Sequence, residues 1–488
     1  MRVLLAASAD SRAREWRAPA PEPLSRGRRA VKKVGLRERG VALILSLVTI
    51  LILTVVLADM HQSTSMSYAL ADTQEDRLQA EYLARSGINL TRLLVAAEPQ
   101  IRQAVTPVYS AMMGGRRPPQ LPVWTYANQV LQPFCDYERA QGMRDSTGID
   151  FSAAEGLGDT GGRCEIVSFS ENSKLNLNNG LHMQGDQARA NVAMQVFAMT
   201  GGLQQPSQYD PLFERRDPDG QITSRLDIVA ALVDWWDADQ QRTAFDPGTG
   251  AITNDAGGED DIYQSFRDPY RVKNAPFDSL EELRYVRGIG DDFWATFVEP
   301  DPDDPTERLV TVYGSGKVNP NEARPIALLW RSCAILQGTT LCTRAEAEKF
   351  VFLLTMVRDL APIPWFENHN HWVEFLEGRG QLYGMLAGLA GDAMFAPITI
   401  TAAQKNAFRG ALVFGAAIIT VQSTGLVGNC PSDEAIPEDE DEESGGGLGR
   451  CTRVRIRSVL NFENRWTPPP PNAGAMPALG IFHHWRVD

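Results

Sequence analysis

The chain has 488 residues, of which 43% are hydrophobic, and it carries a formal net charge of −14. This length allows more than one domain. So acidic a chain is a poor ligand for phosphate backbones, which argues against a nucleic-acid-binding protein.

A basic segment precedes an uncharged apolar run near the N-terminus. Residues 1–39 contain eleven Lys or Arg against four acids, and residues 41–58 contain no charged side chain. Eighteen helical residues rise about 27 Å, close to the thickness of a bilayer core. A buried core helix is the weaker alternative, because soluble helices of this length usually show a polar stripe. The basic side is expected to stay in the cytoplasm, which sends the rest of the chain across the membrane.

Polar residues follow the apolar run without breaking the helical pattern. Apolar residues recur at helix-compatible spacings up to Leu94, and residues 41–86 contain no Gly or Pro. The pattern predicts one helix over residues 41–95, with a membrane-spanning part and an amphipathic stalk. Gly40, at the border of the apolar run, suits a protease that requires an extended backbone at the scissile bond.

This arrangement resembles type IV pilin-like proteins, in which a prepilin peptidase removes a basic leader that ends in glycine. The resemblance implies cleavage between Gly40 and Val41, loss of residues 1–40 and methylation of the new N-terminus. Major pilins usually carry Glu as the fifth mature residue, whereas this chain has Leu45. A subunit without that carboxylate cannot offset a neighbour's buried ammonium, so it suits the end of a filament. The absence is a feature of the K-type minor pseudopilins of type II secretion systems.

The cysteines indicate disulfides rather than a metal site. They are even in number and show no C-x-x-C spacing, which favours an oxidising compartment. Six cysteines allow fifteen pairings, and pairing in sequence order is the hypothesis adopted. The candidates are Cys135, Cys164, Cys333, Cys342, Cys430 and Cys451.

Two acidic clusters lie on either side of a Gly-rich loop in residues 226–270. Asp237 and Asp239 follow a predicted helix, and Glu259 and Asp260 follow the loop. Such clusters can converge on Ca²⁺, which takes six to eight oxygen ligands, and the lack of nearby Cys or His argues against zinc. A solvated acidic loop is the alternative. The segment also resembles the "DWxDxD...GxEDxxY" signature of K-type pseudopilins, which implies a calcium site built from these four acids. Two further acids of the segment are less favoured ligands: Asp234 and Asp261.

Residues 270–297 have the pattern of a helix-hairpin-helix. Ser279 and Glu282 fit a capping box for a short helix that ends at Gly288, and a second helix is expected near Asp291. Acids directly after the turn disfavour phosphate binding there. The stretch also resembles the helical domain of K-type pseudopilins, which implies a structural hairpin.

Two asparagine motifs share the pattern Lys-apolar-Asn-x-Asn. Their side-chain amides can close turns, so a structural role is expected. In the resembling family they flank a helical insertion, which implies an inserted domain over residues 181–315 here. The four residues are Asn176, Asn178, Asn319 and Asn321.

Strands are expected on both sides of this insertion, at 164–170, from Gly415 and from Thr452. Residues 96–180 and 413–488 would therefore form the pilin-like part. The acidic, glycine-rich stretch between Cys430 and Cys451 reads as a solvated loop, and a Pro-rich tail follows the last of these strands.

Residues 316–412 enlarge the chain beyond the K-type pattern. Helices are predicted around 344–360 and 371–390. His369 and His371 with Glu367 suggest a membrane-anchored, metal-dependent hydrolase as a minor alternative, although isolated surface histidines are favoured. No nucleophile elbow, P-loop or dinucleotide fingerprint is present.

The expected fold is an α+β pilin-like fold, with a long N-terminal membrane-spanning helix, a small antiparallel sheet and a large all-α insertion that contains the helix-hairpin-helix-like segment. The resemblance implies a non-enzymatic minor pseudopilin at the tip of the type II secretion pseudopilus, which supports pseudopilus assembly and export of folded proteins. Its expected partners are the I-type and J-type minor pseudopilins, the prepilin peptidase and the inner-membrane secretion platform. A minor pilin of a type IV pilus is the nearer alternative.

Overall fold

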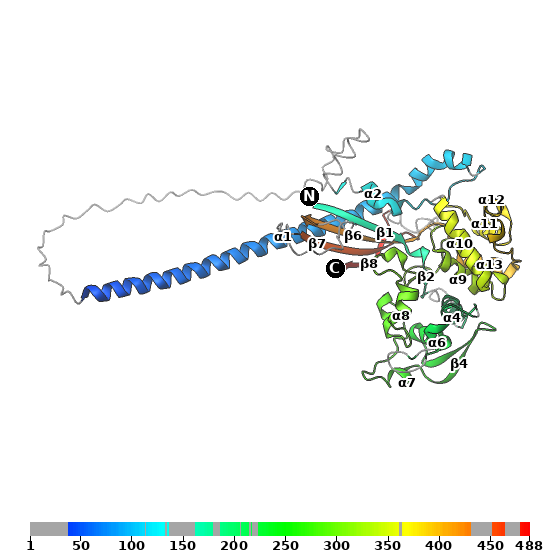
Figure 1. Cartoon of the computed structure of the whole chain (residues 1–488), viewed down its shortest axis with the longest axis horizontal. Coiled ribbons are helices and arrows are strands. Elements are labelled where there is room, and N and C mark those ends of the chain that lie inside the picture. Colours follow the sequence, from blue (N-terminus) through cyan, green and yellow to red (C-terminus); the bar gives the residue numbers. More distant parts are fainter. Residues whose placement is uncertain are drawn as a thin grey trace, which may run out of the picture. The chain divides into compact units, whose positions relative to one another are not determined.

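The computed structural model describes residues 38–112, 114–131, 134–135, 162–178, 186–204, 206–213, 216, 223–360, 364–430, 451–463 and 479–488. The chain divides into two compact units, Met1–Ala71 and Asp72–Asp488, and each is considered by itself (Figure 1). Most of the expected leader, the acidic loop 431–450 and the tail 464–478 lie outside the described residues.

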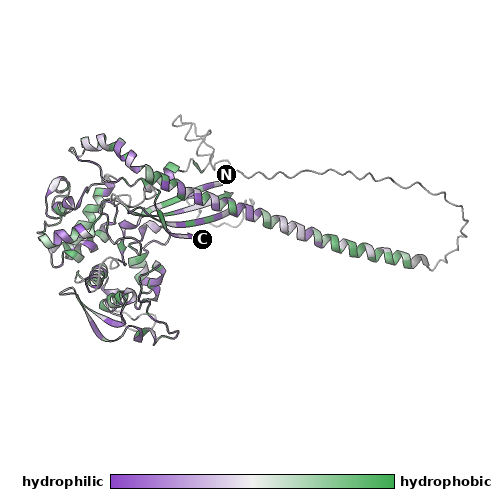
Figure 2. Cartoon of the chain, turned by 180° about the vertical axis from the view of Figure 1, so that it is seen from behind, coloured by the Kyte–Doolittle hydropathy of each residue, from purple (hydrophilic) through white to green (hydrophobic). Residues whose placement is uncertain are grey.

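The described part of the first unit is helical. Helix α1 runs over Glu38–Met112, and its residues 41–71 are all exposed. Figure 2 shows that apolar colour prevails towards the N-terminal end of this helix. Among the described residues, α1 is the one helix long and apolar enough to cross a membrane, by length and composition. The predicted membrane helix is therefore compatible with the structure.

The second unit begins within α1, which packs on a sheet through one face. Ala80, Ala84, Ile88, Thr91 and Val95 are buried and recur every three or four residues, as a single helix face requires. The helix continues beyond the predicted end at residue 95, because its last turns still have packing and hydrogen-bond partners. The buried Glu98 carboxylate accepts a hydrogen bond from the Leu121 amide at 3.0 Å, and the Tyr109 hydroxyl donates to the Pro364 carbonyl at 2.9 Å.

The sheet is antiparallel with the strand order β1-β6-β7-β8. Its strands are β1 (Gly162–Ser170), β6 (Ile418–Gly428), β7 (Cys451–Asn461) and β8 (Ile481–Val487). The three expected strands are confirmed, and Val454, Ile456 and Leu460 of β7 face the core. β8 was not predicted, because its residues are largely exposed and their apolar and polar side chains do not alternate clearly.

Glycine permits the close approach of α1 to the sheet. A Cβ at Gly425 of β6 would lie 1.8 Å from the Ala80 carbonyl oxygen, and a Cβ at Gly87 of α1 would lie 2.2 Å from Ser423 Oγ. Neither position has room for a side chain. The long helix and the second strand of the sheet therefore share a core, together with Trp124 and Ala127 from the short helices η1 (Val123–Tyr126) and α2 (Ala127–Leu131).

Disulfides join the cysteines in sequence order, as hypothesised. Cys135–Cys164 links the segment after α2 to β1, with Cα atoms 5.4 Å apart. Cys430–Cys451 connects the end of β6 to the start of β7, and Cys333–Cys342 lies in the helical region.

The expected insertion starts and ends at two paired strands. β2 (Leu175–Asn176) and β5 (Val310–Thr311) form a parallel pair, and η4 (Glu171–Ser173) precedes β2. The Asn176 amide donates to the Tyr313 and Gly314 carbonyls, and the Asn178 amide donates to Phe277 and Val312 carbonyls, at 2.7 to 2.9 Å. These asparagines hold the chain where it leaves and re-enters the pilin-like part, which confirms their structural role.

The helical region has one hydrophobic core that extends from Leu175 to Leu412. The insertion 181–315 and the enlargement 316–412 share it, since α4 packs against α9. Its longer helices are α4 (Asp186–Met199), α6 (Arg225–Trp236), α9 (Pro325–Ile335), α10 (Arg344–Leu360), α11 (His369–Leu376), α12 (Gly380–Ala390) and α13 (Ala402–Ala411). Its shorter elements are α5 (Asp210–Phe213), β3 (Gln241–Asp246), β4 (Ala251–Gly258), α7 (Asp260–Tyr263), η6 (Leu280–Tyr285), α8 (Asp291–Phe293), η7 (Trp294–Val298), η8 (Pro305–Glu307), η9 (Thr340–Cys342) and η10 (Gly391–Ala393).

The predicted helix at 344–360 is confirmed, whereas the helix expected over 371–390 is two helices, α11 and α12. Gly378 and Gly380 adopt φ values of 73° and 87° between them. These left-handed conformations end the first helix, because a right-handed helix cannot continue through them.

The helix-hairpin-helix-like segment is packed into the helical core. Its first helix, η6, is a 3-10 helix, and Ser279 makes no side-chain cap, so the predicted capping box is wrong. Glu282 instead binds the Lys273 ammonium at 2.8 Å. A Cβ at Gly288 in the turn would lie 2.5 Å from Thr223 Cγ2, so the turn is covered by the residue that leads into α6.

Candidate metal centre

Helix α6 brings the first acidic cluster to the surface of the helical core. Its N-terminus carries a capping box, in which Ser224 and Asp227 satisfy each other's backbone amides. Ile228, Val229, Leu232 and Val233 are buried along the helix. Because this apolar face fixes the helix rotation, the acids of the last turn have defined positions.

A β-hairpin brings the second cluster back to the first. The segment expected to be a flexible Gly-rich loop forms β3 and β4, which pair antiparallel from Gln241 to Gly258. The Asp234 carboxylate accepts a hydrogen bond from the Thr243 amide at 2.9 Å, which attaches the hairpin to α6. Glu259 directly follows β4 and therefore returns to the end of α6.

Asp234, Asp237 and Glu259 form a buried carboxylate cluster. One oxygen of each lies within 4.8 Å of the others, and the three residues are 4%, 6% and 5% exposed. Asp237 Oδ1 and both Glu259 carboxylate oxygens have no hydrogen-bond partner among the described residues. Buried polar atoms are rarely left in this state, and unpaired carboxylate oxygens are the ligands that Ca²⁺ prefers. The residues present therefore fit a hard divalent cation.

Burial and mutual repulsion raise the pKa values of all three carboxyls. Burial is the larger cause, and neighbouring carboxylates add to it. The pKa rises to about 7 for Asp234, to about 6 for Asp237 and to about 9 for Glu259. Without a cation the cluster holds protons near neutral pH, and a bound cation would replace them.

The structure brings together only part of the expected ligand set. Asp237 and Glu259 meet as predicted, but the third member is Asp234, one turn before Asp237 on α6. Asp239 binds Arg189 and accepts a hydrogen bond from the Gln241 amide at 2.8 Å.

The other predicted acids serve the backbone around the site. Asp260 lies in the first turn of α7 and accepts a hydrogen bond from the Val272 amide at 2.9 Å. Asp261 accepts one from the Gly258 amide at 2.8 Å. Neither residue belongs to the cluster of three carboxylates whose oxygens lie within 4.8 Å of one another.

An arginine that the sequence did not single out borders the cluster. Arg189 of α4 lies with Nη1 3.3 Å from Asp237 Oδ2 and 2.9 Å from Asp239 Oδ2. It offsets part of the negative charge but leaves the other Asp237 oxygen unpaired. No sequence pattern connects Arg189 to acids that lie almost fifty residues further along the chain. The one feature that could have drawn attention to it was its place on a helix with buried apolar residues.

Among the described residues, His369, His371 and Glu367 do not form a metal-binding cluster. His369 Nε2 lies 3.3 Å from Arg409 Nε, and His371 Nδ1 lies 3.8 Å from Glu367 Oε2. In the part of the chain that the structure describes, the acidic cluster is the group whose ligand atoms are close enough to share a metal ion. The two C-terminal histidines, His483 and His484, lie on β8 beside Tyr313.

The region around this cluster matches a known protein family. Residues 173–297 match the family described as type II secretion system (T2SS), protein K. This match confirms the resemblance to K-type pseudopilins, and it covers the acidic cluster and the helix-hairpin-helix-like segment. A crystal structure of the GspK-GspI-GspJ complex from the enterotoxigenic Escherichia coli type 2 secretion system is similar at 13% identity, with a TM-score of 0.37 over 67% of this chain and 80% of that chain. Among curated proteins, none matches the sequence.

Proposed function

We propose that this chain, which carries the protein K segment of the type II secretion system in residues 173–297, is a minor pseudopilin at the tip of the pseudopilus. The observation that carries the proposal is this family match. The pilin-like combination of a long apolar N-terminal helix and an antiparallel sheet supports it.

The membrane role follows from α1. We propose that the helix anchors the subunit in the inner membrane with the second unit in the periplasm, and that prepilin peptidase cuts between Gly40 and Val41. Leu45 replaces the glutamate that a shaft subunit would use to neutralise its neighbour's ammonium. Exposed apolar residues continue along α1 beyond the apolar run, where helices of neighbouring subunits would cover them: Tyr68, Leu70, Leu78, Tyr82 and Leu93.

The partners we propose are I-type and J-type minor pseudopilins. The solved complex contains a K-type chain together with GspI and GspJ. Such a tip complex would prime assembly of the pseudopilus on the inner-membrane platform, and it would thereby support the export of folded proteins across the outer membrane.

We propose calcium as the ligand of the acidic cluster, with a structural role. Asp234, Asp237 and Glu259 would hold it, and the ion would tie the hairpin β3–β4 to the end of α6. Once bound it supplies positive charge that lets the three carboxylates ionise together in a buried place.

Mass spectrometry of the protein extracted from membranes tests the processing. The proposal expects a mature N-terminus at methylated Val41, and an intact leader in secretion-competent cells contradicts it. Affinity purification of the extracted protein separates the two pilin-like alternatives. Recovery of I-type and J-type pseudopilins supports the proposal, whereas recovery of type IV pilus subunits instead would identify a minor pilin.

A further inference from the structure

Strand β8 is an open edge of the four-stranded sheet. The strand order β1-β6-β7-β8 leaves β8 with a single neighbour, β7, and Figure 1 shows it at the border of the sheet. Within the described ranges, no backbone hydrogen bond joins Ile481–Val487 to any element other than β7. All seven residues are at least partly exposed. An edge strand with unpaired N–H and C=O groups is a template for a further strand.

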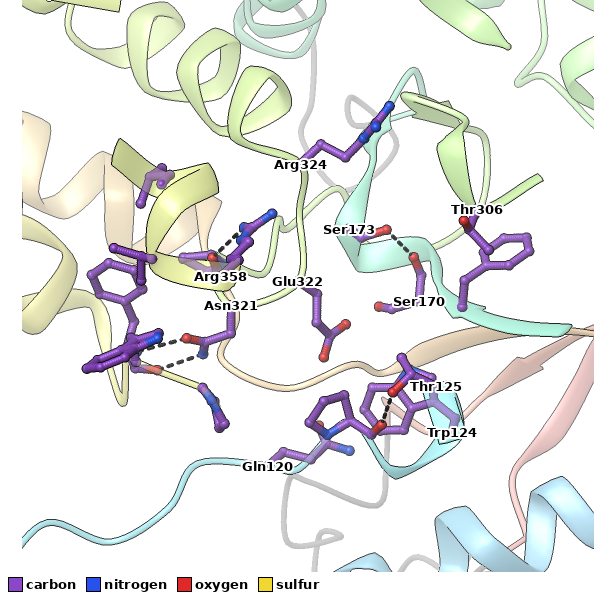
Figure 3. A pocket seen from close by; sticks show the side chains of 18 of the residues that line it. Gln120, Trp124, Thr125, Ser170, Ser173, Thr306, Asn321, Glu322, Arg324 and Arg358 are labelled. Atoms are coloured by element: carbon purple, nitrogen blue, oxygen red, sulfur yellow. Dashed lines mark hydrogen bonds between the residues drawn. The ribbon is translucent and has the colours of Figure 1, made fainter. Parts of the chain in front are cut away.

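The opposite edge of the sheet is covered. The Ile166 amide of β1 donates to Asn128 Oδ1 at 3.0 Å, and the Ser168 hydroxyl donates to the Trp124 carbonyl at 2.5 Å. Figure 3 shows Trp124 of η1 and Ser170 of β1 in the wall of one cavity. The fold therefore shields the β1 edge with η1 and α2, whereas it leaves the β8 edge open.

Two residues of β8 direct their backbone groups to the open side. Arg455 and Asp488 exchange two backbone hydrogen bonds, of 3.3 and 2.8 Å. In an antiparallel pair, such hydrogen-bonded residues alternate with residues whose N–H and C=O groups point away from the partner strand. The register is regular from Asp488 back to His484. It therefore directs the backbone groups of Trp485 and Val487 to the open edge.

One face of β8 is apolar but only half covered. Val487 lies opposite the buried Ile456 of β7, and both are on the face that packs against α1. Phe482 lies opposite the buried Leu460 in the same way. Phe482, Trp485 and Val487 are nevertheless 39%, 38% and 42% exposed. Apolar side chains of an added strand would cover them, because cross-strand neighbours on one face pack together.

The other face of this edge is basic. Arg453, Arg455 and Arg457 of β7 alternate with core residues, so they point away from α1. Arg486 of β8 lies directly opposite Arg457. Like charges in this arrangement destabilise a sheet, and Asp488 supplies one negative charge through its contact with Arg486 at 2.5 Å. A further anionic group on this side would relieve the repulsion.

Backbone, apolar side chains and charge together indicate one kind of occupant. A strand whose side chains alternate between apolar and acidic would bond to the Trp485 and Val487 backbone and neutralise Arg486. Strand addition to an open edge is a common mode of peptide recognition. A second copy of β8 fits poorly, because this strand contains His483, His484 and Arg486 but no acid.

We propose that β8 is the docking edge for an extended segment of a partner protein in which apolar and acidic residues alternate. The apolar side chains of this segment would lie beside Phe482, Trp485 and Val487, and its acidic side chains would lie on the face that carries Arg486. The inference goes beyond the proposed function, since the edge is open whichever filament the chain serves.

The test uses the full chain in detergent micelles and fluorophore-labelled heptapeptides. Acetyl-Glu-Val-Glu-Val-Glu-Val-Glu-amide carries the alternation, and the corresponding lysine peptide reverses its charge. Acetyl-Glu-Glu-Val-Val-Val-Glu-Glu-amide keeps the composition but breaks the alternation. Fluorescence anisotropy should show saturable binding of the alternating acidic peptide and about tenfold weaker binding of the other two. Hydrogen exchange should show new protection of residues 481–487 in the complex.

Two variants separate the contributions of backbone and charge. Val487→Pro removes a donor on the open side without removing a hydrogen bond to β7, so it should weaken the acidic peptide about tenfold. Val487→Thr keeps this donor, and as the matched control it should retain the parent affinity. Arg486→Gln should weaken the acidic peptide about fivefold. Arg344→Gln changes an exposed arginine that pairs with Glu348, and it should leave the affinity unchanged.

Equal binding of the three peptides, or unchanged hydrogen exchange of residues 481–487, overturns the proposal. Full affinity in both Val487→Pro and Arg486→Gln does so as well. Tighter binding of heptathymidylate than of the acidic peptide would also overturn it and would identify a nucleic-acid site. Because the two variants alter different groups, misfolding of one leaves the other informative. A chain located away from the tip would keep these affinities, so failure of the proposed function and failure of this site give separate results.

Discussion

The pilin-like part and the helical region bring distant segments together by opposite means. In the pilin-like part, α1 meets β6 through apolar side chains and two glycines, with backbone atoms almost in contact. In the helical region, α6 and the β3–β4 hairpin meet through three buried carboxylates. The stability of the first contact depends on close packing, and it should not change with added ions. The second depends on charge, and its stability should change with calcium and with pH.

The largest effect is expected from filling the gap between α1 and β6. Gly425→Val places atoms where the Ala80 carbonyl oxygen lies, so we expect the free energy of unfolding to fall by about 3 kcal/mol or more. Gly410→Ala is the matched control, because a Cβ there meets nothing within 4 Å and alanine favours the α13 helix. Thermal denaturation with and without calcium measures both. A Gly425→Val protein as stable as the parent would contradict the close approach.

Calcium should act on the helical region alone. An ion present at one hundred times its dissociation constant stabilises the folded state by about 2.7 kcal/mol. Glu259→Gln should abolish this gain with little effect on the calcium-free protein, because the pKa of about 9 already keeps Glu259 protonated at neutral pH. Calorimetry with calcium and with chelator measures the difference. Equal calcium stabilisation of parent and variant would exclude Glu259 as a ligand.

The calcium-free protein should lose stability as the pH rises. The folded-state pKa values of about 6 to 9 in the cluster exceed the ordinary carboxyl values, so the folded state binds more protons than the unfolded state across this interval. Stability is therefore greatest below about pH 4 as far as these groups are concerned, and it falls as the pH passes through their raised pKa values. Saturating calcium should flatten this dependence. Urea denaturation at pH 5, 7 and 9 provides the measurement, and a slope unaffected by calcium would refute the assignment.

A smaller effect is expected from Arg189→Gln. Loss of the guanidinium removes a positive charge from Asp237 and Asp239, so the calcium-free protein should become less stable while calcium binds more tightly, each by about 1 kcal/mol. Arg242→Gln is the control, since Arg242 pairs with the exposed Asp255. Isothermal titration with calcium distinguishes them. Unchanged affinity in Arg189→Gln would show that the arginine does not affect the site.

The sequence predicted the elements whose signal is local. The apolar run at the start of α1, the alternation in β7 and the periodicity of α10 all lie within single segments, and the start of α1, β7 and α10 were each placed within a few residues. The pairing of cysteines in order was correct because each pair joins neighbouring elements along the chain.

The candidate site was only half predicted, because its geometry depends on tertiary contacts. Asp237 and Glu259 were recognised from their clusters, but the choice of Asp234 over Asp239 depends on the rotation of α6, and Arg189 comes from a helix far away in sequence.

The most direct test of the proposed function is the position of this chain in isolated pseudopili. Gold labelling of an epitope in the second unit, viewed by electron microscopy, locates it. The proposal predicts one labelled end per pseudopilus and an unlabelled shaft. Label distributed along the shaft, or pseudopili that assemble without this chain, would contradict it.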